Sequence, residues 1–270
     1  MRFEPDIGYP EGFVNQARLA VILGSGLSMM QDIVEPELSC SYAAVPGLSP
    51  TSVPGHAGRL LLARMGGKRV ILCAGRHHIY EGFDLEGAGA VVTMAASLGC
   101  RSIVLTQAAG GLHRSLPVDS WLVPDRVVMF PSRGRDMNRA AGDTKTDGTA
   151  AGVGGLIDTH LSDSVARAVQ CAGLTPHRGT VYWTQGPCYE TAAEARAARA
   201  LGADAANMSC LPELLAARRS GTRAACLSWI TNHTVNCSTR RTDHGEVVRK
   251  GERAVQSLAR IVVALARGIG

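Results

Sequence analysis

Short apolar runs alternate with longer segments of helical periodicity along most of this chain, and this alternation restricts the possible folds more than any other feature. The runs at 18–26 and 68–75 are rich in Val, Ile and Leu, end in glycine, and are short enough to be buried strands. The segments between such runs often repeat apolar residues at helical spacing. Strands that alternate with helices predict an α/β fold. No internal repeat interrupts the pattern, so we expect a single domain over residues 1–270.

The periodicity gives an expected position for each element. Thr191 and Glu194 have the spacing of a helix capping box, and Pro124 predicts a turn within a strand-like segment. The expected strands lie at 18–26, 68–75, 101–111, 119–130, 178–186, 203–209 and 222–232. The expected helices lie at 27–34, 85–99, 161–173, 191–202, 212–221 and 244–268.

One long segment, 132–155, fits neither pattern. It is rich in Gly, Ala, Thr and charged residues, which predicts a long flexible loop of the kind that often serves as a lid. A domain boundary could lie in such a segment. The strand–helix alternation resumes after it, however, and this favours one domain.

Composition and charge exclude several classes of protein. Hydrophobic residues make up 46% of the chain, enough for a large core. The net charge of +5 is mild and the arginines are scattered, so we expect no nucleic-acid partner, whereas small anionic substrates are compatible. No apolar run is long enough to span a bilayer, and the first residues lack a signal-peptide pattern. The eight cysteines show no metal-site or C-x-x-C spacing. We therefore expect a reduced, cytoplasmic, soluble protein that binds neither a membrane nor a metal.

A group of polar side chains follows the expected strand at 68–75. In open α/β sheets, ligands bind at the carboxyl ends of the strands. Arg76 and His78 would point to the same face of an extended chain. A guanidinium binds phosphate through two parallel hydrogen bonds, and a neighbouring imidazole adds a donor. The pair predicts an anion site, although a polar strand end is also common on protein surfaces.

Glycine-rich turns after two other strands are compatible with the same site. In the GSGLS motif, the glycines and Ser25 allow backbone N–H groups to approach a phosphate. Met29 stands where a dinucleotide-binding fingerprint needs its third glycine, so a nicotinamide dehydrogenase is disfavoured. The small residues of TQAAGG at 106–111 either fill a tight turn or leave bare backbone against a ligand.

Three further strand ends carry groups that suit a flat heterocycle. Tyr189 and Glu190 follow a Gly-Pro turn, where the aromatic ring can stack and the carboxylate can accept N–H bonds. An alternative is that Glu190 only caps the next helix. Met208 and Ser209 offer an apolar face and a hydroxyl, and Asn232 offers a neutral donor and acceptor. Each motif alone is compatible with a structural role, but together they indicate one binding site.

The ordered set of motifs resembles the trimeric class of purine nucleoside phosphorylases, which act on 6-oxopurine nucleosides. GSGLS, VPGHAG, GRHHIYEG, TQAAGG, GPCYET, NMS followed by PE, ITN and DHGEV occur in the family's order and near its spacing, over roughly residues 18 to 266. The resemblance implies a single-domain, three-layer α/β sandwich with a central mixed sheet. It also implies a homotrimer that cleaves purine nucleosides reversibly to free base and pentose 1-phosphate. Inorganic phosphate is then the co-substrate, and no cofactor or metal is required.

The resemblance also implies a role for each matching residue. The catalytic residues would be Asn232, His78 and Glu190. The residues at the phosphate would be Ser25, His56, Arg76, His78, Ala108 and Ser209. The residues at the sugar would be Tyr80, Met208 and His244. The residues at the base would be Ala109, Tyr189, Glu190, Asn207 and Asn232.

Some positions depart from the family pattern and bear on the choice of substrate. Gln107 stands where asparagine is usual, Asn207 where glycine is usual, and His233 follows Asn232 where other side chains are common. The segment matched to an aromatic that the neighbouring subunit supplies to the sugar, around 158–161, contains no aromatic.

Several other functions stay open at this point. Xanthosine is a possible substrate, and so is a 5′-methylthio nucleoside, although His244 suits a 5′-hydroxyl better. A nucleoside hydrolase would need a carboxylate to activate water in place of the anion-binding set. A nucleoside-binding protein without turnover is also compatible, because fold and pocket do not guarantee activity.

Overall fold

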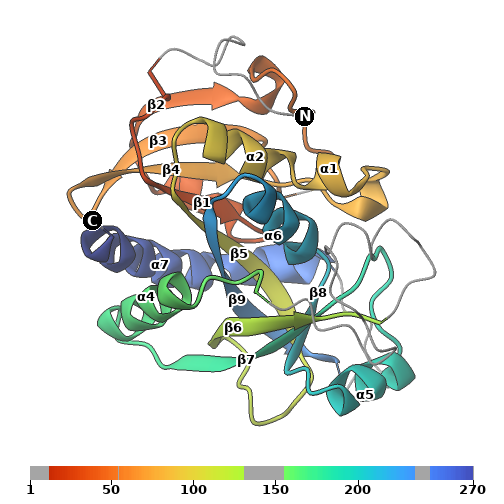
Figure 1. The fold of residues 1–270 in the computed structure, drawn as a ribbon. Coiled ribbons are helices and arrows are strands. Elements are labelled where there is room, and N and C mark those ends of the chain that lie inside the picture. The colour runs from red at the N-terminus through yellow and green to blue at the C-terminus, as the bar shows by residue number, and fades with distance from the viewer. Residues whose placement is uncertain (1–11, 54, 131–154, 235–243, 270) are drawn as a thin grey trace.

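The computed structural model describes residues 12–53, 55–130, 155–234 and 244–269, with the backbone alone at 244–250 and 252. These residues build one mixed sheet with helices on both faces (Figure 1). The predicted α/β class and central mixed sheet are therefore confirmed. The strands are β1 (Leu19–Leu23), β2 (Pro36–Ser41), β3 (Arg59–Met65), β4 (Lys68–Ala74), β5 (Ser102–Gly111), β6 (Trp121–Val128), β7 (Pro176–Trp183), β8 (Ala205–Asn207) and β9 (Arg223–His233).

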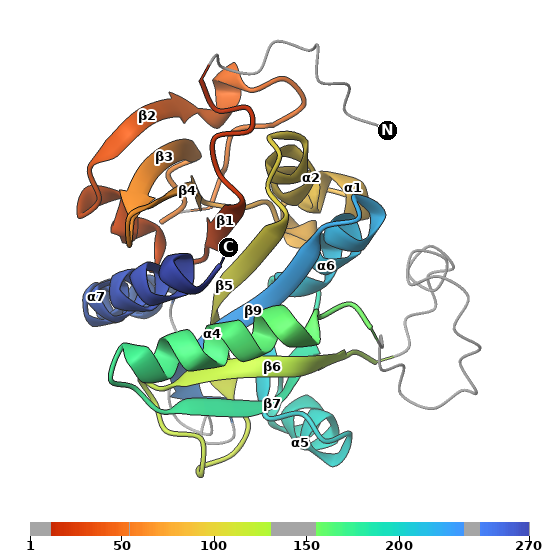
Figure 2. The ribbon, with the colours of Figure 1, turned by 60° about the vertical axis from the view of Figure 1, so that its left-hand side comes forward.

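The sheet is open at one end and closed on itself at the other. Its strand order is β2-β3-β4-β1-β5-β8-β7-β6-β9, and β9 pairs back onto β5 in parallel. The last five strands in this order therefore form a closed, barrel-like unit. Figures 1 and 2 show β6 and β7 crossing the direction of β5 and β9. This closure was not predicted from the sequence.

Helices cover the sheet on two sides. One side carries α1 (Leu85–Ala88), α2 (Ala90–Ser97) and α6 (Cys210–Arg219), and the other carries α4 (Thr159–Cys171) and α7 (His244–Gly268) (Figure 2). A third, small cluster lies beneath α5 (Ala192–Ala200). The alternating faces of β1 separate the two main cores, because Ile22 packs towards α2 and α6 while Val21 packs towards α4 and α7.

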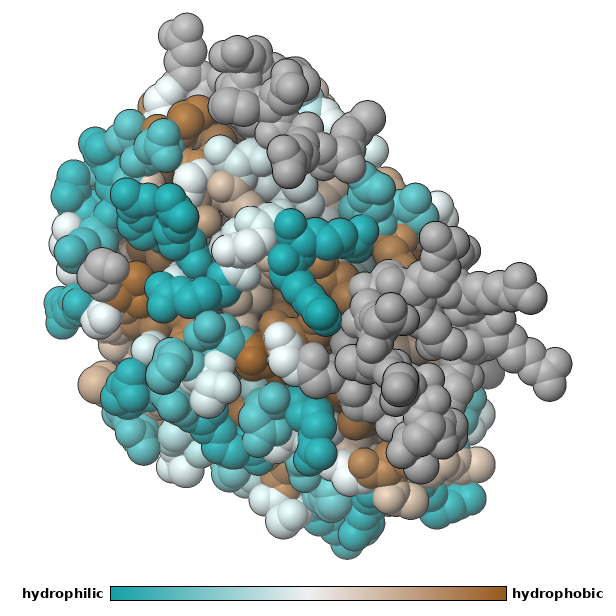
Figure 3. All heavy atoms as spheres, in the orientation of Figure 1, coloured by the Kyte–Doolittle hydropathy of each residue, from teal (hydrophilic) through white to brown (hydrophobic). Residues whose placement is uncertain are grey.

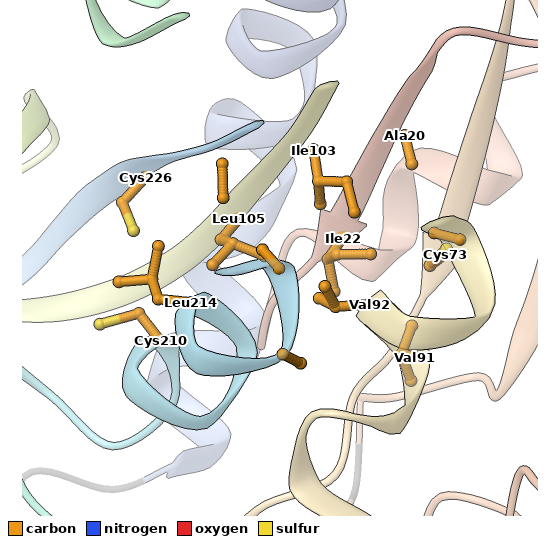
Figure 4. Close-up of a cluster of buried hydrophobic side chains, with 14 of the residues drawn as sticks. Ala20, Ile22, Cys73, Val91, Val92, Ile103, Leu105, Cys210, Leu214 and Cys226 are labelled. Carbon is orange, nitrogen blue, oxygen red and sulfur yellow. The ribbon is translucent and has the colours of Figure 1, made fainter. Parts of the chain in front are cut away.

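The core beneath α2 and α6 consists of small and branched side chains that fit closely together. In Figure 4, Val91 and Val92 of α2 lie next to Ile22 of β1, and Leu214 of α6 lies next to Leu105 of β5. All of these side chains are fully buried. Close packing of this kind fixes the position of α6 on the sheet.

Several expected elements differ in detail. The segment expected as a helix at 27–34 is a short 3₁₀ helix at Ser28–Asp32, and the helix expected at 85–99 is divided at Gly89. Pro124 makes no turn, because β6 continues past it with an irregular register against β7. The strand expected at 203–209 covers only three residues, as β8. Two strands, β2 and β3, were not predicted.

Some expectations lie outside the described residues. The proposed flexible loop falls almost entirely within 131–154, and Cys237 lies within 235–243. The other cysteines are free thiols. Among the described helices, none combines the length and the apolar character that a membrane span requires.

The visible face of the described residues is mainly polar. In Figure 3 hydrophilic residues dominate, and apolar ones occur in small separate areas. The large hydrophobic side chains that are exposed among the described residues are few: Ile33, Leu38, Val118 and Tyr189. One of them, Tyr189, belongs to the site described next.

Candidate active site

A pocket lies where β1, β4, β5, β8 and β9 end. Apart from His56, all residues predicted for the site whose side chains are described line this pocket. The polar groups at separate strand ends are therefore brought together, as expected for this kind of sheet. The lining residues that the sequence did not single out for a role are Gly24, Gln107, Gly110, Ala206, Thr231 and Thr234.

The pocket lies along a stretch of β5 that pairs with a neighbouring strand on one side only. On one side, β5 pairs with β9 along its whole length. On the other side, β1 pairs with residues 102–105 and β8 with residues 110–111. Residues 106–109 between them have no strand partner on that side. This gap between β1 and β8 leaves backbone groups of β5 available to a ligand.

Ala108 directs its backbone N–H into this gap. The Thr106 carbonyl points to the side of β1, because it accepts a hydrogen bond from Arg76, whereas the Ala109 carbonyl points to β9 and accepts from Thr231. Backbone groups alternate along a strand, so those of Ala108 point the same way as those of Thr106. The geometry therefore makes the Ala108 N–H a donor at the pocket.

The loop after β1 approaches β5 very closely at Gly24. A Cβ atom at this position would lie 2.7 Å from the Thr106 carbonyl oxygen and 2.9 Å from the Gln107 Cα. Only glycine fits against this backbone. The Thr106 hydroxyl holds the loop by donating to Ile22 O at 2.8 Å and accepting from Gly24 N at 3.3 Å. Thr106, which the sequence did not reveal, thereby positions Ser25 at the pocket.

Arg76 lies at the point where β1 and β5 separate. It follows β4, which ends at Ala74, so the expected strand geometry at Arg76 and His78 is wrong although both side chains line the pocket. Its Nη2 donates to the Thr106 carbonyl at 2.6 Å and to the Ile22 carbonyl at 3.3 Å. The guanidinium is only 1% exposed. Its Nε and Nη1 atoms have no hydrogen-bond partner among the described residues.

A buried carboxylate lies behind Arg76. Glu213 of α6 is 1% exposed, and its Oε1 lies 3.4 Å from the Arg76 Nε. Burial raises the pKa of Glu213 to about 7, although the charge of Arg76 opposes the rise. Glu213 does not line the pocket, and its place in the PE motif is the only feature of the sequence that pointed to it.

His78 is held by a second carboxylate. Its Nδ1 donates to the Glu81 Oε1 at 2.8 Å, and its backbone N–H donates to the same oxygen. Burial lowers the pKa of His78, although Glu81 opposes this. A neutral imidazole that keeps its proton on Nδ1 has an acceptor at Nε2. His78 therefore offers the pocket an acceptor, where the sequence had predicted a donor.

Glu81 is ionised at neutral pH. Burial raises its pKa, but the hydrogen bonds from His78 and from the Ser52 hydroxyl outweigh burial and hold the pKa at about 2. Tyr80 stacks on the His78 ring with centroids 4.7 Å apart. Burial raises the pKa of Tyr80 to about 12, so its hydroxyl keeps its proton. Glu81 thus fixes the orientation of His78, a function that the sequence did not assign to it.

His56 lies beside the pocket rather than in its lining. Its Nε2 is 3.3 Å from the Ser25 hydroxyl, and its ring centroid is 5.4 Å from that of His78. His56 is therefore in contact with two predicted phosphate residues. The backbone of His244 begins α7, but its side chain lies outside the described residues.

Tyr189 and Glu190 lie at the open side of the pocket. Tyr189 is 45% exposed, and burial raises the pKa of Glu190. Thr191 and Glu194 form the predicted capping box of α5, with the Thr191 side chain accepting from the Glu194 N–H. This box is formed by Thr191 and Glu194 without a hydrogen bond from Glu190.

Two asparagines lie near these residues and are held in different ways. The Asn232 Oδ1 accepts from the Thr231 hydroxyl at 2.7 Å, and its amide lies over Gly110. The Asn207 Oδ1 accepts from the backbone N–H groups of Ser209 and Cys210, so it satisfies donors at the start of α6. Asn207 therefore fixes the turn that presents Ser209 to the pocket.

Gly186 brings the sugar-side residues close together. Its φ of +73° is in the left-handed region, and a Cβ atom there would lie 2.7 Å from both the Met208 sulfur and the Tyr80 ring. Any larger residue would displace these two side chains. The turn before Tyr189 therefore sets the width of the pocket between Tyr80 and Met208.

Comparison with known proteins agrees with this arrangement. A model of the phosphorylase superfamily matches residues 18–267. Purine nucleoside phosphorylase from Mus musculus is 32% identical over 93% of this chain and 89% of its own. The chain belongs to the purine nucleoside phosphorylase family. The purine nucleoside phosphorylase 1 of Geobacillus stearothermophilus is 28% identical over 96% of this chain and 94% of its own.

Solved purine nucleoside phosphorylases share the fold. The enzyme from Schistosoma mansoni in complex with inosine has a TM-score of 0.80 and 26% identity, and it covers 94% of this chain and 91% of its own. A Schistosoma enzyme in complex with hypoxanthine has a TM-score of 0.79 with the same identity and coverage. The predicted family, and with it the prediction of an enzyme of this class, is confirmed. The roles of the individual residues stay predictions.

Proposed function

We propose that this chain catalyses the reversible phosphorolysis of 6-oxopurine ribo- and deoxyribonucleosides, with inosine and guanosine as substrates, in purine salvage. The observation that carries the proposal is that one pocket is lined by two chemically different groups of residues. Arg76 bonds Thr106 at one end of the gap in β5, near Ser25 and Ala108, whereas the Asn232 amide lies over Gly110 at the other end, and we place Glu190 with Asn232. When phosphate binds at the first end and the base binds at the second, the glycosidic bond of the nucleoside lies between them.

Phosphate binds at the end formed by β1, β4 and β5. Arg76 donates from the nitrogens that have no partner in the described residues, and the Ser25 and Ser209 hydroxyls and the Ala108 N–H add neutral donors. His78 accepts the proton that phosphate still carries near neutral pH, because its Nε2 is the acceptor of the ring. His56 supports Ser25 from behind.

The reaction exchanges one bond at the anomeric carbon of the sugar for another. A phosphate oxygen forms a bond to C1′, and the C1′–N9 bond breaks with its electron pair leaving on the purine. Tyr80, Met208 and His244 hold the sugar between these groups. Placing nucleophile and nucleoside side by side lowers the entropic barrier. The bound phosphate also balances the positive charge that develops on the sugar.

Asn232 and Glu190 stabilise the leaving base. The Thr231 hydroxyl donates to the Asn232 Oδ1 and so orients the amide, whose NH₂ group donates to N7 or O6 of the base as negative charge develops. An ionised Glu190 accepts from N1–H, which adenine lacks. Tyr189 and the small side chains of Ala109 and Asn207 complete the base site. The pair Glu190 and Asn232 therefore favours hypoxanthine and guanine over adenine.

The proposal includes the surroundings of the enzyme. Inorganic phosphate is a co-substrate, and neither a cofactor nor a metal takes part in the mechanism. We propose a cytoplasmic homotrimer that binds no nucleic acid and no membrane. Sedimentation of the purified protein tests the trimer directly.

A substrate panel tests the proposed base preference. Initial rates of base release are measured with inosine, guanosine, xanthosine and adenosine at saturating phosphate. Inosine and guanosine are expected to react. Adenosine should react at least about a hundredfold more slowly, because adenine has no N1–H and leaves the Glu190 carboxylate without its hydrogen bond. Efficient cleavage of adenosine contradicts the role of Glu190, and a preference for xanthosine contradicts the proposed substrates.

Replacing the carboxylate at the base end gives a second test. Glu190→Gln is expected to lower kcat/KM for inosine by about tenfold to a hundredfold, because a charged hydrogen bond to N1–H is worth about 1.5–3 kcal/mol. KM for phosphate should change little, since Glu190 lies at the other end of the pocket. Equal losses for phosphate and inosine would contradict the division of the pocket into two ends.

A further inference from the structure

Glu213 has no task in the mechanism above, yet it is one of the least exposed charged residues among those described. It is 1% exposed, and neither of its carboxylate oxygens has a hydrogen-bond partner in the described part of the chain. A buried carboxylate without hydrogen bonds is costly to keep ionised. Among the described residues its one close cation is Arg76, at 3.4 Å between Oε1 and Nε.

The position of Glu213 is fixed by the packing of its helix. Cys210 and Leu214 of α6 are fully buried and lie against Leu105 and Cys226 of the sheet (Figure 4). Glu213 therefore cannot turn to solvent without unpacking α6. Arg76 is equally fixed, because its Nη2 donates to the carbonyls of Ile22 and Thr106.

The Arg76 guanidinium consequently lies between the Glu213 carboxylate and the pocket in which an anion binds. Glu213 lies behind it, outside the pocket lining, and the pocket lies in front of it. We propose that Glu213 is an internal counter-ion of Arg76 that takes up a proton from solvent when an anion binds in the pocket. The inference rests on the proposed function, because it takes Arg76 as part of the phosphate site.

The physical reason is competition for one positive charge. In the free protein, Arg76 stabilises the ionised form of Glu213. A dianion in the pocket adds negative charge close to Glu213 and draws on the same guanidinium, so it raises the pKa of Glu213 further. That pKa is already about 7 in the free protein. Above this pH, anion binding must therefore be accompanied by proton uptake, and the affinity for the anion falls as the pH rises.

Other titratable groups face Glu213 or the same anion. Three buried groups interact with Glu213: Tyr42, Cys73 of β4 and Cys226 of β9. Burial raises the pKa of Tyr42 and of Cys73 well above the usual values. The pKa of Cys226 is also raised well above its usual value, first by a hydrogen bond with Cys210 and then by burial. They remain neutral near pH 7. The adjoining α2 and β5 carry no titratable side chain, and Glu86 of α1 is exposed. His56 and His78 can also favour an anion at low pH, so the test must separate them from Glu213.

The test measures binding of sulfate, which stays a dianion between pH 6 and 9 and so removes the titration of phosphate itself. Sulfate dissociation constants are measured by calorimetry for the wild type and Glu213→Gln. Glu37→Gln is the control, since Glu37 also pairs with arginines but lies on the exposed edge strand β2. In the wild type and the control, affinity should fall about tenfold per pH unit above pH 7. In Glu213→Gln the affinity should fall clearly less steeply with pH over the same range, because only the contribution of His56 and His78 remains.

A spectroscopic measurement on the wild type removes the dependence on a variant that must fold. Infrared difference spectra of the wild type on adding sulfate at pH 8 should show a protonated carboxyl band that is absent without sulfate. Equal pH dependence of the two proteins, or no carboxyl band in the wild type, overturns the inference. Failure of the wild type to bind sulfate or phosphate at any pH would instead contradict the anion site and the proposed function.

Discussion

At the scale of single residues, the site depends on buried side chains that hold other side chains in place. Glu81 orients His78, Thr106 holds the Gly24 turn, and Asn207 accepts from the backbone N–H groups at the start of α6. The sequence analysis predicted this supporting role for none of the three residues. A sequence pattern identifies groups by their chemistry at a strand end, whereas these partners come together only through contacts between loops and strands.

The link between Glu81 and His78 can be tested by pH. The pKa of Glu81 is depressed to about 2, so ionised Glu81 contributes stability above about pH 4.5 that is lost as the pH falls towards 2. Glu81→Gln should lower the free energy of unfolding at pH 7 by about 1–2 kcal/mol, and the difference should vanish towards pH 2. The measurement is denaturant unfolding of both proteins across this range.

The same variant should affect catalysis through His78. Glutamine can keep a hydrogen bond but does not fix the proton on Nδ1, so kcat/KM for phosphate should fall about tenfold or more. Glu35→Gln, at an exposed carboxylate that does not line the pocket, is the control and should change neither quantity. If the stability of Glu81→Gln depended on pH in the same way as that of the wild type, this would contradict the depressed pKa of Glu81.

At the scale of elements, the pocket exists because β5 loses a strand partner over four residues and because α7 packs behind the loop after β1. A Cβ atom at Gly251 of α7 would overlap the backbone carbonyl of Gly26. The first turns of α7 therefore support the loop that carries Ser25. This contact joins α7 to the loop after β1, and no local sequence pattern predicts it.

Gly251→Ala tests this support. Within an exposed helix the change should stabilise the protein by about 1 kcal/mol. Here the methyl group must displace Gly26, so we expect a loss of stability of about 1–3 kcal/mol and a KM for phosphate raised several-fold. Gly268→Ala in the same helix is the control, since a Cβ atom there meets nothing within 4 Å. Unchanged phosphate kinetics in Gly251→Ala would show that α7 does not position the loop.

The unexpected elements have physical explanations. β2 was not predicted because five of its six residues are exposed and no apolar alternation marks it. β3 was missed although 60–63 is apolar, because arginines at 59 and 64 flank a short run. The segment expected as a helix at 27–34 is a short 3₁₀ helix that packs against α7 and β4, contacts that no local pattern predicts.

At the scale of the whole molecule, the sequence was sufficient for the fold class and for the group of strand ends that form the pocket. Arg76, Glu190 and Asn232 were all placed near one another by the rule that ligands bind at the carboxyl ends of strands. The barrel-like closure was not predictable, since the pairing of β5 with β9 joins residues more than a hundred positions apart. Glu213 was equally hidden, because a carboxylate in a helix normally faces solvent.

The most direct test of the central claim identifies the sugar product. Inosine is incubated with the enzyme with and without inorganic phosphate, and both hypoxanthine and the sugar are quantified. The account predicts base release only with phosphate, and ribose 1-phosphate in equal amount to hypoxanthine, because phosphate held by Arg76 is the nucleophile. Release of free ribose at the same rate without phosphate would contradict it.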